Sequence, residues 1–271
     1  MPAADPLNSI RAAIERHPRL RHRSQDFDLR LEDGTIVLEG YVEDIAARRL
    51  LPRIAAETGG GMGVLDRLRI KQDGARGDAD LAGAVEGLLA AEPVFEGYRL
   101  MQGQSSDLPA EPGRVLCVNA KEGVVRLTGT VESLSHRRMA EALAWWVSGT
   151  ADVDNRLYVS PAERDSDDEI TDAVRLLLEK DPWIDPGHLG IHTRNRVVVL
   201  SGTLPGEEQK RMAENNAWYV AGVHDVDNRI STAEWARQNE CADEASRESF
   251  PASDPPSMTP VVGVGGIDRN G

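Results

Sequence analysis

Two histidines and four aspartates are the residues whose spacing suggests metal chemistry. His188 and His192 lie four positions apart in an expected strand, so both would face one side of a sheet. Two imidazoles can begin a zinc site, but no further ligand follows at a suitable spacing. The four aspartates precede two Asn-Arg pairs: Asp152, Asp154, Asp225 and Asp227. Their carboxylates could bind a cation through oxygen, but they lack the loop of an EF-hand, so we expect no metal site.

Sequence motifs for enzymatic chemistry are absent. The chain has no G-x-S-x-G elbow, no P-loop and no dinucleotide fingerprint, and no spacing of serine and histidine nominates a catalytic triad. Cys117 and Cys241 have neither CxxC nor zinc-site spacing, so we expect both thiols to stay reduced. We predict no enzymatic activity and no cofactor.

The charge and hydrophobicity of the chain exclude some classes of protein. Its 271 residues include 45 acidic and 31 basic side chains, a formal net charge of −14, which argues against a nucleic-acid binder. No apolar run approaches the ~18 residues of a membrane-spanning helix. Residues 1–20 lack the apolar segment of a secretory signal. We expect a cytoplasmic protein without a transmembrane segment.

A cluster of arginines near the start of the chain is a candidate lipid-binding site. Arg16, Arg19, Arg21 and Arg23 crowd the loop after the first expected helix. Beside an anionic membrane, each arginine would contribute roughly 1 kcal/mol of attraction. The acidic remainder of the chain would oppose this attraction over about one Debye length of 8–10 Å. The alternative is an ordinary solvated loop.

Two tryptophans are candidates for a contact surface. Trp145 and Trp218 occupy the same position of two similar helical segments, about 150° from the centre of the apolar stripe. A large apolar side chain that points outward usually marks an interface, with a partner or with a second copy of the chain. The alternative is that both pack against a neighbouring copy of the repeated unit described next.

Three segments of the chain align with one another without gaps: residues 35–70, 124–159 and 197–232. A glycine in each lies 27 residues before an arginine. The glycines are Gly40, Gly129 and Gly202, and the arginines are Arg67, Arg156 and Arg229. Each glycine ends an apolar strand, where it allows close approach or an unusual dihedral angle, so we expect a structural role for it.

The same order of elements is predicted in each copy. Each copy begins with a helix that has apolar residues four and eight positions before a proline and ends just before it; the prolines are Pro18, Pro93 and Pro182. Two short strands follow, in which apolar and polar residues alternate. A second helix is expected over 43–58, 132–148 and 205–221, and a third strand over 65–70, 153–159 and 226–232.

The sequence therefore predicts an α+β fold of three tandem αββαβ units, each a three-stranded sheet covered by two helices. The units are expected over residues 5–72, 78–160 and 166–233, with a turn-rich insertion near 102–114 in the second. Residues 234–271 are rich in Ser, Pro, Gly and acidic residues, and we expect a disordered tail. Because domains this small are marginally stable, contacts between copies or an oligomer would help.

The repeated pattern resembles the BON (bacterial OsmY and nodulation) domain. The third copy carries VVVLSGTL and AGVHDVDNRI, and the second carries VVRLTGTV and VDNRLYV. The first departs most, since Asp66 in GVLDRLRI replaces the asparagine. The resemblance implies tandem αββαβ domains, a mostly periplasmic or envelope setting, osmotic stress, and contact with phospholipids or protein partners. Some cytoplasmic members sense potassium, and no catalytic residues accompany the family.

These observations favour a cytoplasmic, non-enzymatic binding or scaffold protein. It would act through protein contacts, including self-association, and the resemblance implies a stress-related role. One alternative is peripheral binding to anionic phospholipid through the arginine loop. A second alternative, supported by the family resemblance, is a sensor of a small ion or small ligand.

Overall fold

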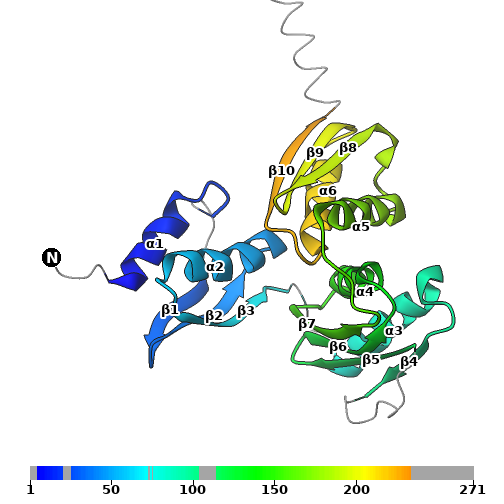
Figure 1. Ribbon diagram of the computed structural model, residues 1–271, viewed down its shortest axis with the longest axis horizontal. Coiled ribbons are helices and arrows are strands. Elements are labelled where there is room, and N and C mark those ends of the chain that lie inside the picture. Colours follow the sequence, from blue (N-terminus) through cyan, green and yellow to red (C-terminus); the bar gives the residue numbers. More distant parts are fainter. Residues whose placement is uncertain (1–4, 21–25, 73, 75, 104–113, 233–271) are drawn as a thin grey trace, which may run out of the picture. The chain divides into compact units, whose positions relative to one another are not determined.

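The computed structural model describes residues 5–20, 26–72, 74, 76–103 and 114–232 (Figure 1). The expected disordered tail, residues 234–271, lies outside the described residues. So do residues 104–113, which hold most of the expected insertion, and two of the candidate arginines, Arg21 and Arg23.

Three αββαβ units follow one another along the chain and are named repeats 1 to 3. Repeat 1 contains α1 (Pro6–Arg16), β1 (Asp26–Glu32), β2 (Thr35–Val42), α2 (Ile45–Thr58) and β3 (Gly63–Ile70). Repeat 2 contains α3 (Asp78–Ala91), η1 (Pro93–Phe95), β4 (Arg99–Gln102), β5 (Val115–Lys121), β6 (Val124–Val131), α4 (Leu134–Trp146) and β7 (Asp152–Val159). Repeat 3 contains α5 (Asp167–Lys180), η3 (Pro186–His188), β8 (Leu189–Arg194), β9 (Val197–Leu204), α6 (Glu207–Tyr219) and β10 (Asp225–Thr232). The predicted α+β class and order of elements are confirmed.

The second helix of each repeat begins two residues later than expected, and in repeats 1 and 2 the side chain of the residue before it caps the helix. In repeat 1, the carboxylate of Asp44 accepts a hydrogen bond from the Ala47 amide at 2.9 Å. In repeat 2, the Ser133 hydroxyl accepts one from the His136 amide at 3.2 Å. Such caps satisfy amides that have no partner within the helix and so fix where it starts.

The sheet of each repeat has the same central arrangement. An antiparallel hairpin is followed by a parallel pairing, because the second helix crosses over between the last two strands (Figure 1). Both central residues of each hairpin turn have positive φ, which is the geometry of a type I′ turn. Repeat 3 has no glycine there, and its turn residues Asn195 and Arg196 have φ of 51° and 62°. The Asp167 carboxylate accepts hydrogen bonds from both of their amides, at 2.7 and 2.9 Å.

Repeat 2 departs from the expected three strands. Its sheet has four, in the order β4-β5-β6-β7, and β4 pairs parallel with the edge of β5. The residues between Pro93 and β5 are numerous enough to form an extra edge strand before the chain returns. This extra strand ends at Gln102, where the expected insertion begins.

The three repeated glycines lie where a side chain cannot fit. Gly40, Gly129 and Gly202 have φ of +132°, +127° and +113°, a region that L-amino acids rarely adopt. A Cβ at Gly202 would also overlap the backbone carbonyl oxygen of His188, where the hairpin strand passes close by. The other two glycines face the carbonyl oxygens of Asp26 and Val115 in the same way. The structure thus provides a steric reason for the structural role that we expected.

Among the residues that the structure describes, buried apolar side chains form two clusters. One cluster lies within repeat 2, between its helices and its sheet. The other joins the interiors of repeats 1 and 3, and it includes Ala142 and Trp145 from α4 of repeat 2. The apolar contacts between copies that such small units need are therefore made within one chain.

We expect Gly202→Ala to lower the free energy of unfolding by about 1–3 kcal/mol or more, because the new Cβ imposes strain at a positive φ and a steric overlap. Urea denaturation followed by tryptophan fluorescence measures the change. The control is Gly87→Ala on the exposed face of α3, where a Cβ meets open space. This control should be unchanged or more stable by up to ~1 kcal/mol. Equal losses in the two variants would contradict the steric explanation.

Candidate functional site

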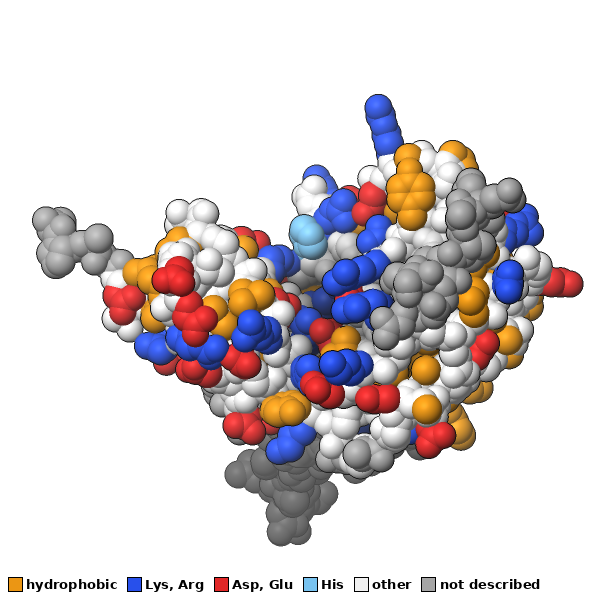
Figure 2. Space-filling model, turned by 90° about the horizontal axis from the view of Figure 1, so that it is seen from below, with side chains coloured by type: hydrophobic (Ala, Val, Ile, Leu, Met, Phe, Trp, Pro, Cys, Tyr) orange, Lys and Arg blue, Asp and Glu red, His pale blue; other side chains and the backbone are white. Residues whose placement is uncertain are grey.

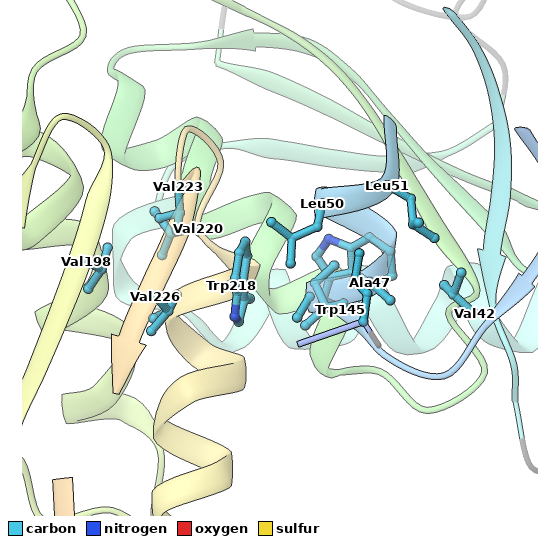
Figure 3. Packing of buried hydrophobic residues seen from close by; sticks show 14 of the residues in the cluster. Val42, Ala47, Leu50, Leu51, Trp145, Val198, Trp218, Val220, Val223 and Val226 are labelled. Carbon is cyan, nitrogen blue, oxygen red and sulfur yellow. The ribbon is translucent and has the colours of Figure 1, made fainter. Parts of the chain in front are cut away.

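The two tryptophans are buried within the chain, which matches the alternative that they pack against a neighbouring repeat and not the outward contact surface. Trp218 is 0% exposed and Trp145 is 8% exposed. In Figure 3, Trp218 lies beside Leu50 of α2, and Trp145 lies close to Ala47 on the same helix. The helical wheel places each ring on the opposite side of its helix from the apolar stripe. The wheel cannot show that the second helices of the repeats pack against one another. This packing buries the rings of Trp145 and Trp218.

Arg19 also differs from the expected membrane-facing residue. Its guanidinium forms an ion pair with Glu214 and donates a hydrogen bond to the backbone oxygen of Val226, both in repeat 3. It also lies 6.0 Å from the centre of the Trp218 ring, within the range of a cation–π contact. Arg16 is exposed, and its Nε donates to the Ala12 carbonyl at 2.9 Å. Arg19 therefore joins two repeats instead of presenting its charge to a membrane.

Two equivalent glutamates connect the second helices to the rest of the molecule. In repeat 2, Glu141 accepts hydrogen bonds from the Asn155 amide at 2.9 Å and from Arg49 of repeat 1 at 2.5 Å. In repeat 3, Glu214 takes the same two kinds of partner, Asn228 at 3.0 Å and Arg19. The asparagine of the repeated Asn-Arg pattern thus holds a glutamate that binds an arginine from repeat 1. Sequence reasoning missed both glutamates, although they align in the repeats.

Repeat 1 replaces this arrangement with an ion pair. Asp66 stands where the other copies have asparagine, and its carboxylate binds Arg48 of α2. Arg48 also reaches Asp152 of repeat 2 at 2.9 Å. The aspartate that replaces the asparagine in repeat 1 therefore helps to hold Arg48, which also contacts repeat 2.

Repeats 2 and 3 are also joined, in this case by a buried arginine. Arg138 of α4 is 3% exposed, donates to the Ala221 carbonyl at 2.9 Å and pairs with Asp165. Asp165 lies 3.0 Å from the Arg196 guanidinium as well. Burial alone would raise the pKa of Asp165, but the two arginines outweigh it and hold this pKa below its usual value.

A pocket of about 350 Å³ lies between α4, α6 and the chain that follows α5. Ligand pockets commonly have volumes of ~300–1,000 Å³ and largely apolar walls. Four aromatic side chains line it: Trp145, Trp146, Trp183 and Tyr219. The Trp145 and Tyr219 rings stack with their centres 6.2 Å apart, whereas Trp183 is 71% exposed. The pocket therefore combines fixed rings with one accessible ring.

A chain of buried polar groups crosses the pocket wall. The Trp146 indole Nε1 donates to Asn216 at 2.9 Å, and the Asn216 amide donates to Asp181 at 2.7 Å. The second carboxylate oxygen of Asp181 accepts the Trp183 backbone amide at 3.0 Å. Asn216 occupies a position that is apolar in the other two repeats, so its departure from the helical stripe is the sequence signal for this site. Asp181 and Trp183 gave no periodic signal.

The two histidines considered for metal binding do not share one strand. His188 lies in η3, not in the strand with His192, so the expected pair on one strand does not form. In the part of the chain that the structure describes, no three His, Cys, Asp or Glu side chains gather as metal ligands. Ser133 lies 2.6 Å from the His136 ring, but this contact belongs to the cap of α4.

The BON domain family model matches three segments, residues 8–72, 108–161 and 166–234, which together make up more than half of the chain. The chain belongs to the BON domain family. The osmotically-inducible protein Y of Escherichia coli (strain K12) is 32% identical over 123 residues. That match covers 43% of this chain and 61% of the relative, so the chain spans less than two thirds of that protein.

Solved structures give weaker matches. CdsD, a structural protein of the type III secretion system of Chlamydia trachomatis, is 15% identical with a TM-score of 0.24, covering 90% of this chain and 98% of that chain. Its C-terminal domain is 14% identical with a TM-score of 0.21, covering 85% and 98%. Such scores support no inference about function. Among the described helices, none is long and apolar enough to cross a bilayer.

We expect Trp218→Ala to lower the free energy of unfolding by about 3–5 kcal/mol, because it leaves a large cavity where three repeats meet. Trp183→Ala is the matched control, and its 71% exposed ring predicts a change within about 0.5 kcal/mol. Urea denaturation of both variants measures the difference. A small effect of Trp218→Ala would show that the junction does not stabilise the fold.

Asp165→Asn should destabilise the protein at pH 7, with an effect that disappears on acidification. A carboxylate whose pKa is lowered by folding stabilises the native state above its unfolded pKa of ~3.9. That contribution is lost as the pH falls through the lower native pKa of Asp165. Unfolding free energies of the two proteins at pH 7 and about pH 3 provide the test. The same difference at both pH values would contradict this origin of the stability.

Proposed function

We propose that this chain is a non-enzymatic binding protein in which three BON repeats form a scaffold for one aromatic pocket. The observation that carries this proposal is the set of rings and buried polar groups at the junction of repeats 2 and 3. Trp146, Asn216 and Asp181 are linked by hydrogen bonds of 2.9 and 2.7 Å, so the pocket wall is organised before any ligand arrives. Preorganisation of this kind lowers the entropic cost of binding.

The geometry supports binding in preference to catalysis. A catalytic site needs a nucleophile or base placed against a group that stabilises developing charge. The pocket lining has one carboxylate, Asp181, and both of its oxygens already accept hydrogen bonds from the protein. Its remaining lining groups are rings, amides, a proline and a methionine, which suit recognition of an apolar or flat group.

A protein partner is the ligand class that we favour. Trp183, 71% exposed beside the pocket, is the kind of side chain that dominates binding energy at protein interfaces. A side chain of the partner would enter the pocket while Trp183 packs against its surface. A stress-related role is supported by the 32% identity to the osmotically-inducible protein of Escherichia coli. A cytoplasmic location is part of the proposal, supported by cysteines without disulfide or zinc spacing.

The alternative of binding anionic phospholipid has less support. Arg19 is held by Glu214 and lies near Asp225, so one of the four expected arginines is already engaged. On the face shown in Figure 2, acidic side chains lie among the basic ones instead of leaving a uniformly basic surface. Anionic membranes attract clusters of basic residues, and neighbouring carboxylates weaken that attraction. A small-ligand role remains compatible with the same pocket.

The partner should depend on Trp183. We expect affinity capture from the native cell with the wild-type chain to recover a protein that Trp183→Ala loses by about tenfold or more. Tyr158→Ala is the control, because Tyr158 is 66% exposed on β7 and does not line the pocket. Quantitative mass spectrometry compares the three samples. Equal recovery of the partner by the wild-type chain and both variants would show that the pocket does not bind the partner.

A further inference from the structure

We propose that the aromatic pocket receives an organic cation, an alkylammonium or guanidinium group held between the rings and Asp181. This inference rests on the proposed binding function and specifies the chemistry of the ligand. The starting observation is the charge of the pocket wall. Asp181 is 8% exposed, and it is the acidic residue among those that line the pocket.

Asp181 is the exception among the buried charges. Of the charged residues that the structure describes, three are buried: Arg138, Glu141 and Asp181. Arg138 pairs with Asp165, and Glu141 pairs with Arg49. Within the described chain, no Lys, Arg or His nitrogen lies within 4.0 Å of the Asp181 carboxylate. Buried charges are normally paired, so an uncompensated carboxylate in a pocket favours a ligand of opposite charge.

The hydrogen bonds to Asp181 hold the carboxylate in place without neutralising it. Its two partners, the Asn216 side-chain amide and the Trp183 backbone amide, are uncharged donors. The neighbouring Lys180 is not available, because its ammonium binds Glu92 of repeat 2. The Asp181 carboxylate therefore has no cationic partner among the described residues, although it belongs to a residue that lines the pocket.

The rings supply the second half of a cation site. The face of an aromatic ring carries partial negative charge, and cages of such rings recognise quaternary ammonium groups. Trp146 is oriented by its bond to Asn216, and Trp145 and Tyr219 are fixed by stacking. Trp183 adds an accessible ring at the same pocket. The rings suit the apolar body of an organic cation, and the carboxylate of Asp181 suits its positive charge.

The same lining disfavours other ligands. An anion would be repelled by Asp181, and a neutral apolar group would leave its charge uncompensated. A bare Ca²⁺ ion takes six to eight oxygen ligands, and this pocket wall offers few beside one carboxylate. A guanidinium or a quaternary alkylammonium group is larger and more weakly hydrated than a primary ammonium, and it suits a volume of about 350 Å³.

Two neutral isosteres separate charge from shape. The full chain is titrated with choline and with 3,3-dimethylbutan-1-ol, in which carbon replaces the charged nitrogen. A second pair is a short peptide with a central arginine and the same peptide with citrulline, whose ureido group has the shape of a guanidinium without its charge. Isothermal titration calorimetry and tryptophan fluorescence report binding. We expect the cationic member of at least one pair to bind about tenfold tighter or more, because a desolvated charge pair contributes at least this factor.

Substitutions assign the preference to the pocket. Asp181→Asn should remove the preference for the cationic member, whereas Asp172→Asn, the same change at an exposed site on α5, should keep it. Trp183→Ala should weaken the cation about two- to fivefold, as expected for an exposed cation–π contact, and the neutral isostere less. If Asp181→Asn does not fold by circular dichroism, the Trp183→Ala comparison decides the question.

The outcomes distinguish this inference from the proposed function. Preference for choline indicates a small free cation, and preference for the arginine peptide alone indicates a side chain of a partner protein; both support the inference. Equal binding of charged and neutral probes, an unchanged preference in Asp181→Asn, or no binding of any probe would overturn it. Loss of the captured partner in Trp183→Ala would still support the proposed function in those cases.

Discussion

The contact between the second helices of the repeats is the interaction on which the rest of the molecule depends. Each repeat alone has one apolar sheet face and two covering helices, which is a small core. Trp218 and Trp145 extend this core by filling the space beside α2, so that the interiors of repeats 1 and 3 become continuous. A buried tryptophan removes roughly 150–250 Å² of surface from water. Three marginal units thereby support one another within a single chain.

Charges at this junction determine which surfaces meet. Glu141 and Glu214 each bind an asparagine of their own sheet and an arginine of repeat 1. Because a buried charge without its partner is costly, such pairs penalise a wrong arrangement more than they stabilise the correct one. The apolar rings supply the attraction, and the ion pairs supply the specificity. The aromatic pocket lies beside this junction because it is built from the ends of the same helices.

Local features of the fold could be predicted from the sequence, and contacts between repeats could not. Prolines, glycines and apolar spacing encode helix ends, turns and strand faces within a few residues, so Gly202 and the hairpin turns were predictable. The burial of Trp218 and the engagement of Arg19 depend on how separate units dock, which no local period records. Asn216 is the polar residue in the otherwise apolar stripe of α6. The sequence therefore contained a signal for this part of the candidate site. The fourth strand of repeat 2 had no periodic signal, since β4 is only four residues long.

The ion pairs of Glu141 and Glu214 restrict how the number and order of the repeats can change during evolution. In α2 the position equivalent to Glu141 and Glu214 is occupied by Pro52, so repeat 1 supplies arginines and has no matching acceptor there. The three repeats have similar folds, but in these ion pairs repeat 1 supplies the arginines and repeats 2 and 3 supply the glutamates. Deletion, duplication or reordering of a repeat would leave a charged side chain at this junction without its ion-pair partner. Lineages carrying this arrangement should therefore keep both the number and the order of their repeats.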